Sequence, residues 1–169
     1  MRPTENNTNN EGDRMAATHT CIFCEIIANR SPAAVVYRDA HCVAILDAFP
    51  LTRGHLLLIP HQHQQHIEDL PPETVAYLFQ LGARFSAVLR QNGESEATAV
   101  VLNNGKAANQ HVPHVHLHVI PRRSGDTALV VWRYMTRFVN PWSYIGRNAR
   151  LARQALTWKT LLKDTALAG

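Results

Sequence analysis

The chain has 169 residues, 46% hydrophobic and 18% charged, which is the composition of one globular domain with a sizeable core. No apolar run approaches the ~20 residues that a bilayer-spanning helix needs, so we expect no membrane span. The net charge of +4 is uneven, because residues 1–121 carry 8 basic and 11 acidic side chains and residues 122–169 carry 9 basic and 2 acidic. We interpret the basic segment as an exposed helix face and expect no nucleic-acid binding.

The N-terminus and the cysteines indicate the compartment. Residues 1–20 are rich in Asn, Thr and Glu and lack the apolar stretch of a signal peptide, so we expect a disordered tail. Three cysteines are an odd number in a chain without an export signal, which argues against a disulfide framework and predicts a cytoplasmic protein. We expect Cys42 to be a buried apolar residue.

The first elements of the chain are predicted to be a short helix and three strands. Residues 21–27 suit the helix, and the β-prone runs 35–37 and 43–46 predict a hairpin around residues 39–41. The almost continuous apolar run 55–60 predicts a strand that is buried on both faces.

A long helix is predicted next. Pro71 and Pro72 suit a first turn, and Asn92-Gly93 is a stop signal. The small Gly82 predicts close packing within an apolar stripe at helical spacing, which comprises Val75, Leu78, Gly82, Phe85 and Leu89. A strand at residues 99–102 follows.

Residues 114–121 alternate strictly between histidine and aliphatic side chains. In a strand, Val115, Leu117 and Val119 would face a core and the three histidines would line the other face. Imidazoles on alternate residues are about 6.6 Å apart at the backbone, so two of them can converge on one zinc ion and three cannot.

Apolar residues recur less regularly after residue 126 than in the preceding part of the chain. Residues 129–132 predict a further strand or a loop that covers the site, and residues 144–162 predict a helix. We expect this helix to bury one face, formed by Ile145, Ala149, Ala152, Leu156 and Leu161. The three tryptophans are expected in the core or at a substrate entrance. The fold class is therefore α+β, an antiparallel sheet with helices packed on one face.

At these residues the chain resembles the histidine-triad (HIT) family, in particular its Hint and Fhit branches. The resemblance rests on the triad at residues 114–118, on the segment 54–60 (Gly-His-Leu-Leu-Leu-Ile-Pro) and on Asn103-Asn104-Gly105, and it extends from Cys21 to Asp126. It implies a catalytic domain at residues 21–126, followed at 127–169 by an extension whose basic helix packs on or near the domain. It also implies a homodimer.

The resemblance implies hydrolysis or transfer at the α-phosphate of nucleotide conjugates through a covalent nucleotidyl-histidine. His116 would be the nucleophile, because a neutral imidazole with a pKa of ~6.5 keeps a free lone pair when its other nitrogen donates to a fixed acceptor, such as a backbone carbonyl. The catalytic residues implied are His114, His116, His118 and Gln110. The substrate-binding residues implied are Asn103, His55, Gln110 and His118.

One residue departs from the family pattern. Many relatives carry Ser or Thr directly after the glutamine, and here His111 stands there, so the proton donor to the leaving group stays open. Phosphoramidates, acyl adenylates and dinucleoside polyphosphates are all possible substrates. The Ile-Pro-Arg end of the triad strand slightly favours dinucleoside polyphosphates.

The Cys21-x-x-Cys24 pair indicates either a metal site or an inert thiol pair. Some family members bind zinc through such a pair and two histidines, which correspond here to His63 and His114; His61 is the alternative to His63. Four ligands would close the coordination shell, so the zinc would be structural. No redox cofactor is implied.

Two other functions are compatible with the sequence. One is a nucleotide-binding regulatory module with little turnover, which would lose nothing measurable when Asn replaces His116. The other is a nucleic-acid binder that uses the basic C-terminal segment, and the absence of aromatic residues at regular spacing among its basic residues argues against it.

Overall fold

Five antiparallel strands form the centre of the computed structural model, which describes residues 21–136, 139 and 146–163. Their spatial order is β1-β2-β3-β5-β4. The strands are β1 (Val35–Arg38), β2 (Cys42–Leu46), β3 (Leu56–Pro60), β4 (Ala97–Leu102) and β5 (Leu117–Arg122). The helices are α1 (Ile22–Ile27), α2 (Pro72–Gln91), α3 (Thr127–Thr136) and α4 (Arg147–Lys163), with short 3-10 turns η1 (Ile67–Asp69) and η2 (Lys106–Ala108). The predicted α+β class is confirmed.

The middle strand β3 is buried on both faces, as predicted. Leu56 and Leu58 belong to the larger core, and Leu57 and Ile59 belong to a smaller core on the other face. Antiparallel pairing places Leu57 opposite His118 of β5. A strand that is buried along its whole length therefore fixes the position of a triad histidine.

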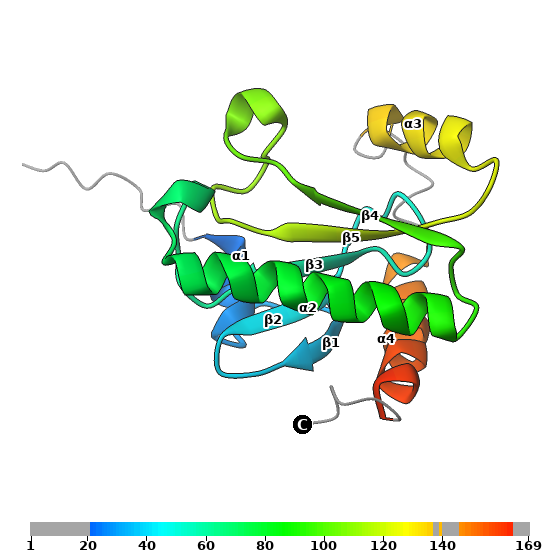
Figure 1. Ribbon diagram of the computed structural model, residues 1–169, viewed down its shortest axis with the longest axis horizontal. Coiled ribbons are helices and arrows are strands. Elements are labelled where there is room, and N and C mark those ends of the chain that lie inside the picture. The colour runs from blue at the N-terminus through cyan, green and yellow to red at the C-terminus, as the bar shows by residue number, and fades with distance from the viewer. Residues whose placement is uncertain (1–20, 137–138, 140–145, 164–169) are drawn as a thin grey trace, which may run out of the picture.

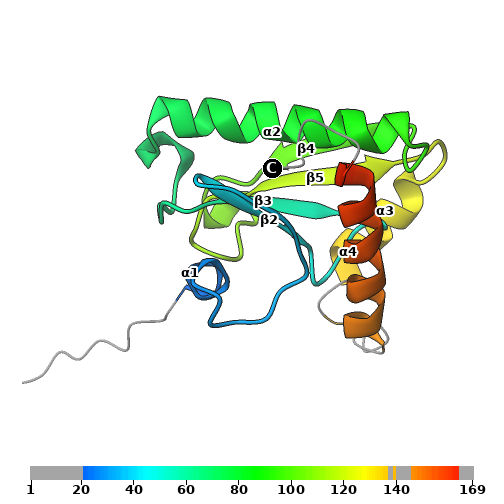
Figure 2. The ribbon, with the colours of Figure 1, turned by 90° about the horizontal axis from the view of Figure 1, so that it is seen from below.

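Helix α2 crosses the face of the sheet that carries the larger core, whereas α1 lies on the opposite side (Figures 1 and 2). A Cβ atom added to Gly82 would lie 3.1 Å from the Cδ2 atom of Leu117. The small residue thus lets α2 approach β5 closely, as its place in the apolar stripe predicted.

The C-terminal helix α4 shares the larger core with α2. Its buried side chains are Ala155, Trp158 and Leu162, and the Trp158 ring packs edge-on against Phe85 at 5.5 Å. The predicted apolar face was wrong: Leu156 is 68% exposed, because the helix turns its tryptophan rather than this leucine to the core.

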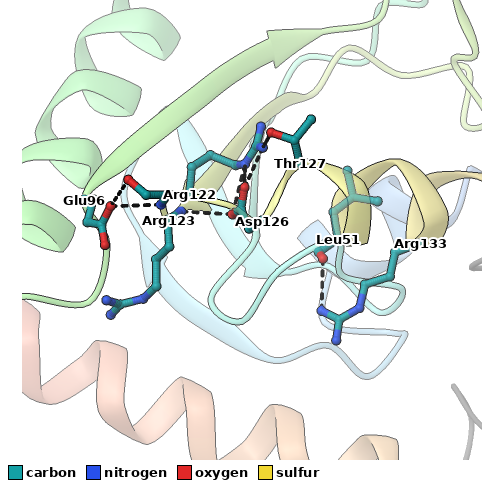
Figure 3. A network of polar contacts seen from close by, with 8 residues as sticks. Leu51, Glu96, Arg122, Arg123, Asp126, Thr127 and Arg133 are labelled. Carbon is teal, nitrogen blue, oxygen red and sulfur yellow. Dashed lines mark hydrogen bonds and ion pairs between the residues drawn. The ribbon is translucent and has the colours of Figure 1, made fainter.

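Residues 129–132 lie in the helix α3, so the prediction of a strand or loop was wrong. Strand β5 already pairs with a strand on each side, and the chain leaves the sheet after it. The turn before α3 is held by Arg122 and Asp126, whose closest atoms are 2.6 Å apart, and Arg133 of α3 donates to the carbonyl of Leu51 at 3.0 Å (Figure 3).

Two sets of sequence predictions lie outside the described residues. They are the tail at residues 1–20 and the segment that contains Trp142, Tyr144 and Ile145. Among the helices of the described part, none combines the length and the apolar character that would let it cross a membrane.

Candidate active site

Only one histidine of the triad lies within a strand. Strand β5 begins at Leu117, so His114 and His116 precede it, which corrects the prediction of a strand from residue 114. The cause is a different backbone partner: the N–H of Val115 donates to the carbonyl of Gln64, in the loop after β3, at 2.7 Å. The alternation nevertheless persists, because Val115 and Leu117 are buried in the larger core.

His116 is held in one tautomer by the backbone. Its Nδ1 lies 2.8 Å from the carbonyl oxygen of His114, which can only accept a hydrogen bond. The ring proton is therefore on Nδ1, and Nε2 is the unprotonated nitrogen of the ring. The ring of Phe23 in α1 packs edge-on against the imidazole at 5.0 Å, and the ring of His118 lies 4.9 Å away. The arrangement is that of a positioned nucleophile.

His118 is oriented by a buried chain of hydrogen bonds. The backbone N–H of Leu51 donates to Nδ1 of His55 at 3.2 Å, so the proton of that ring is on Nε2, which donates to Nδ1 of His118 at 2.9 Å. Oδ2 of Asp47 lies 3.4 Å from Nδ1 of His55, farther away than the nitrogen of Leu51, so we assign the tautomer from the Leu51 contact. Neutral His118 consequently carries its own proton on Nε2 and can donate it to an anion.

A cleft of about 1070 Å³ opens beside these imidazoles. His116 and His118 line it together with Asn103 and His111, and Asp47 is the only carboxylate among its described lining residues. Much of the remaining wall is apolar and comes from α1, from the segment that leads into β1, and from α4. Its size and lining suit a ligand larger than a single phosphate.

The side chains of Gln110 and His55, two residues predicted to bind substrate, make hydrogen bonds within the protein. The side chain of Gln110 bridges two loops: its Oε1 accepts from the N–H of Gly105 at 2.6 Å, and its Nε2 donates to the carbonyl of Gln65 at 2.8 Å. Neither Gln110 nor His55 is among the lining residues of the cleft. Both therefore lie behind the residues that face it, where Gln110 holds loops and His55 orients His118.

Cys21, Cys24, His63 and His114 form a compact cluster. The Nδ1 atoms of the two histidines are 3.2 Å apart, Cys24 Sγ lies 3.3 Å from Nδ1 of His63, and Cys21 Sγ lies 3.5 Å from Nδ1 of His114. Tetrahedral zinc with bonds of ~2.0–2.3 Å places its ligand atoms roughly 3.3–3.8 Å apart, so these four donors fit the ion. His63, and not His61, is the loop histidine that lies in this cluster.

The surroundings of His114 suit a metal ligand. Its Nε2 donates to the carbonyl of Pro60 at 3.0 Å, which leaves Nδ1 without a proton and directed into the cluster. Burial lowers the pKa of His114 to about 4 and raises the pKa of the Cys24 thiol above its usual range. His114 therefore stays neutral near pH 7, the form that binds metal.

A second buried group, Asp47, His55 and His118, also has ligand atoms within 4.8 Å of one another. The hydrogen bond between the two histidines already uses the nitrogens that an ion would need, so we assign this group to proton placement. Sequence reasoning missed Asp47 and Phe23. Asp47 had a signal, since it is a carboxylate directly after the apolar run of β2, whereas the sequence analysis offered none for Phe23.

A family model described as the HIT domain matches residues 28–125, more than half of the chain. The protein belongs to this family. An uncharacterized HIT-like protein of Mycobacterium tuberculosis is 44% identical over 69% of this chain and 81% of its own length. The adenylylsulfatase HINT3 of Arabidopsis thaliana is 35% identical over 75% of this chain and 66% of its own length. The adenosine 5′-monophosphoramidase HNT1 of Saccharomyces cerevisiae is 34% identical over 66% and 68%.

A solved structure agrees with the fold. The zinc-bound histidine triad family protein from Mycobacterium smegmatis superimposes with a TM-score of 0.64 at 35% identity, covering 83% of this chain and 96% of that one. The predicted family and fold are thus confirmed by independent comparisons.

Proposed function

We propose that the protein is a nucleotide hydrolase or nucleotidyl transferase that cleaves nucleoside 5′-phosphate conjugates at the α-phosphate. The observation that carries this proposal is the hydrogen bond from Nδ1 of His116 to the carbonyl of His114, which places the ring proton on Nδ1 and leaves Nε2 unprotonated in a residue that lines the cleft. The relatives that are named as an adenylylsulfatase and a monophosphoramidase support the reaction class.

The proposed reaction has two displacements. Nε2 of His116 attacks the α-phosphorus, a P–N bond forms, and the bond between phosphorus and the leaving group breaks. The Nε2–H of His118 donates to a phosphoryl oxygen as charge develops there. Water then attacks the nucleotidyl-histidine, the P–N bond breaks, and the nucleoside monophosphate is released. This division replaces one difficult hydrolysis by two easier steps.

We propose that the Cys21, Cys24, His63 and His114 cluster holds a structural zinc ion. When bound, zinc would supply a closed coordination shell that ties α1 to the segment before β5, and no site would remain for water. The same residue, His114, offers its side chain to the metal and its carbonyl to His116. The cluster would therefore fix the backbone on which the nucleophile depends.

The proposal is tested by mixing the protein with adenosine phosphoramidates, adenosine 5′-phosphosulfate and diadenosine polyphosphates. We expect turnover of at least one class and a nucleotide adduct on the peptide that contains His116, seen by mass spectrometry without acid. Binding of nucleotides with neither turnover nor adduct would instead favour the regulatory module.

Substitution of His55 tests the buried hydrogen-bond chain. We expect His55→Ala to lower kcat about tenfold with little change in KM, because one hydrogen bond to a catalytic group is worth ~1.5 kcal/mol. His55→Gln keeps an N–H donor for His118 and should recover part of the loss. Steady-state kinetics at equal folded fraction, checked by thermal melting, measures both; equal losses in the two variants would contradict a role in proton placement.

A further inference from the structure

Helix α1 connects the metal cluster to the cleft. Phe23, which lines the cleft, lies in the sequence between the two cluster thiols Cys21 and Cys24. The Phe23 ring packs edge-on against the imidazole of His114 at 5.9 Å and against that of His116 at 5.0 Å. One short helix, with the residue that precedes it, therefore carries two donors of the cluster and an aromatic contact to the proposed nucleophile.

The two ends of α1 are held by different groups. At the C-terminal end, the guanidinium of Arg38 donates to the carbonyl of Ile27 at 2.9 Å and to that of Ile26 at 3.3 Å. At the N-terminal end, the side chains of Cys21 and Cys24 contact the two histidines of the cluster. Loss of an ion bound there would therefore loosen the N-terminal end of α1, beside the wall of the cleft.

The two thiols of the cluster are placed so that they can form a disulfide. Residues three apart in the first turn of a helix have Cα atoms about 5 Å apart, within the range of roughly 4.4–6.8 Å found in disulfides. The ligand atoms of the cluster, both sulfurs included, lie within 4.8 Å of one another. Cys21 and Cys24 are half-buried and His63 is exposed, so a small oxidant can reach the sulfurs and an ion can leave.

The third cysteine differs from these two. Cys42 is fully buried, and burial raises the pKa of its thiol to about 12. Because the thiolate is the form that oxidants attack, Cys42 should stay reduced where Cys21 and Cys24 react. The chain thus contains an internal reference for selective oxidation.

We infer that the cluster is a redox switch, in which oxidation of Cys21 and Cys24 to a disulfide releases zinc and lowers turnover. This inference rests on the zinc site and the reaction proposed above. Two thiolates and two neutral imidazoles fill a tetrahedral shell and balance the charge of the ion. After oxidation, His63 and His114 alone would remain as ligands, and both are uncharged, so the affinity for zinc falls.

The oxidation removes two electrons, and we assign a peroxide as the oxidant. One thiolate attacks a peroxide oxygen, the O–O bond breaks, a sulfenic acid forms and the departing hydroxide takes a proton to give water. The second thiolate attacks the sulfenic sulfur, the S–S bond forms, and the S–O bond breaks with release of a second water as another proton is taken up. Two thiolates, one hydrogen peroxide and two protons thus give one disulfide and two waters, while zinc keeps its oxidation state.

Loss of zinc would reach His116 by two routes. The side chain of His114 would lose its bond to the metal, and the carbonyl of the same residue accepts the hydrogen bond that sets the tautomer of His116. The N-terminal end of α1 would loosen as well, and with it the Phe23 ring that packs on His116. We therefore expect turnover of the oxidised protein to be roughly ten- to hundredfold lower, the usual effect of removing groups that support a site.

The test uses the full chain loaded with zinc and treated with a small excess of hydrogen peroxide. Released zinc is followed with a chromophoric chelator, and the cysteines are mapped by alkylation and peptide mass. We expect one zinc ion released per disulfide, a loss of about 2 Da at the Cys21–Cys24 pair, and an alkylated Cys42. Excess dithiol with zinc should restore both the metal content and the turnover. Zinc that stays bound after the disulfide has formed, or turnover that is unchanged, would overturn the inference.

Two variants serve as matched controls. Cys24→His keeps a zinc ligand and removes the disulfide, so it should retain its zinc under the same peroxide treatment, whereas Cys42→Ala should release zinc as the wild type does. Release from Cys24→His at the wild-type rate would contradict the switch. Should Cys24→His take up no zinc, the ratio of released zinc to disulfide in the wild type decides.

Failure of the switch can be distinguished from failure of the proposals on which it rests. A wild-type protein that takes up no zinc refutes the zinc site before any oxidant is added. A protein that turns over no nucleotide conjugate still reports zinc release and disulfide formation, because neither measurement needs a substrate.

Discussion

Replacement of the central imidazole by an amide, His116→Asn, is expected to lower kcat by at least about a thousandfold while nucleotide binding persists. Asparagine is of similar polarity and its side-chain N–H can still donate to the carbonyl of His114, but it has no nucleophilic lone pair. The measurement pairs steady-state turnover with the Kd of the product nucleotide, determined by calorimetry.

The control for this variant is His41→Asn, which changes an exposed histidine that packs against Tyr77 outside the cleft and should keep full activity. Undiminished turnover of His116→Asn would remove the imidazole from the mechanism. A weaker Kd for the nucleotide with unchanged kcat would show that the imidazole contributes to binding and not to the chemical step.

Emptying the cluster of Cys21, Cys24, His63 and His114 is expected to have the second largest effect, on the stability of the protein and on its turnover. We expect Cys24→Ser, or treatment with a strong zinc chelator, to empty the site and lower the free energy of unfolding by at least ~2 kcal/mol, which is roughly 4–8 °C in Tm. Turnover should fall as well. Without the ion the side chain of His114 would no longer be held, and the carbonyl of the same residue, which orients His116, would no longer be fixed in place. Metal analysis and scanning calorimetry of the same samples measure the two effects.

The remaining cysteine offers a control. Cys42 is fully buried in the larger core, away from the cluster, so Cys42→Ala should keep one zinc ion per chain. A protein that is purified without metal and melts at the same temperature with and without chelator would contradict the zinc proposal and favour an inert thiol pair.

Local patterns were enough to predict much of the fold. The buried run of β3, the stripe of α2 with Gly82 and the burial of Cys42 follow from periodicity and side-chain size, and the structure confirms all three. The alternation at residues 114–118 likewise predicted which side chains face the core, since that choice depends on the chain itself.

Features set by distant residues could not be predicted. The backbone of Val115 bonds to a loop instead of a strand, Leu156 is exposed because Trp158 takes the core, and Gln110 holds loops because two backbone groups come within its reach. Each outcome depends on a partner more than forty residues away or on the placement of a whole helix. The homodimer stays a prediction.

Three hydrogen bonds of the catalytic segment are accepted by peptide carbonyls, which are those of His114, Gln64 and Pro60. Peptide groups are the same whatever side chain they carry, so mutation of neighbouring side chains leaves these anchors in place. The position of the His116 backbone should therefore tolerate wide divergence in sequence. Val115→Pro would remove the N–H that donates to Gln64, and we expect it to displace His116.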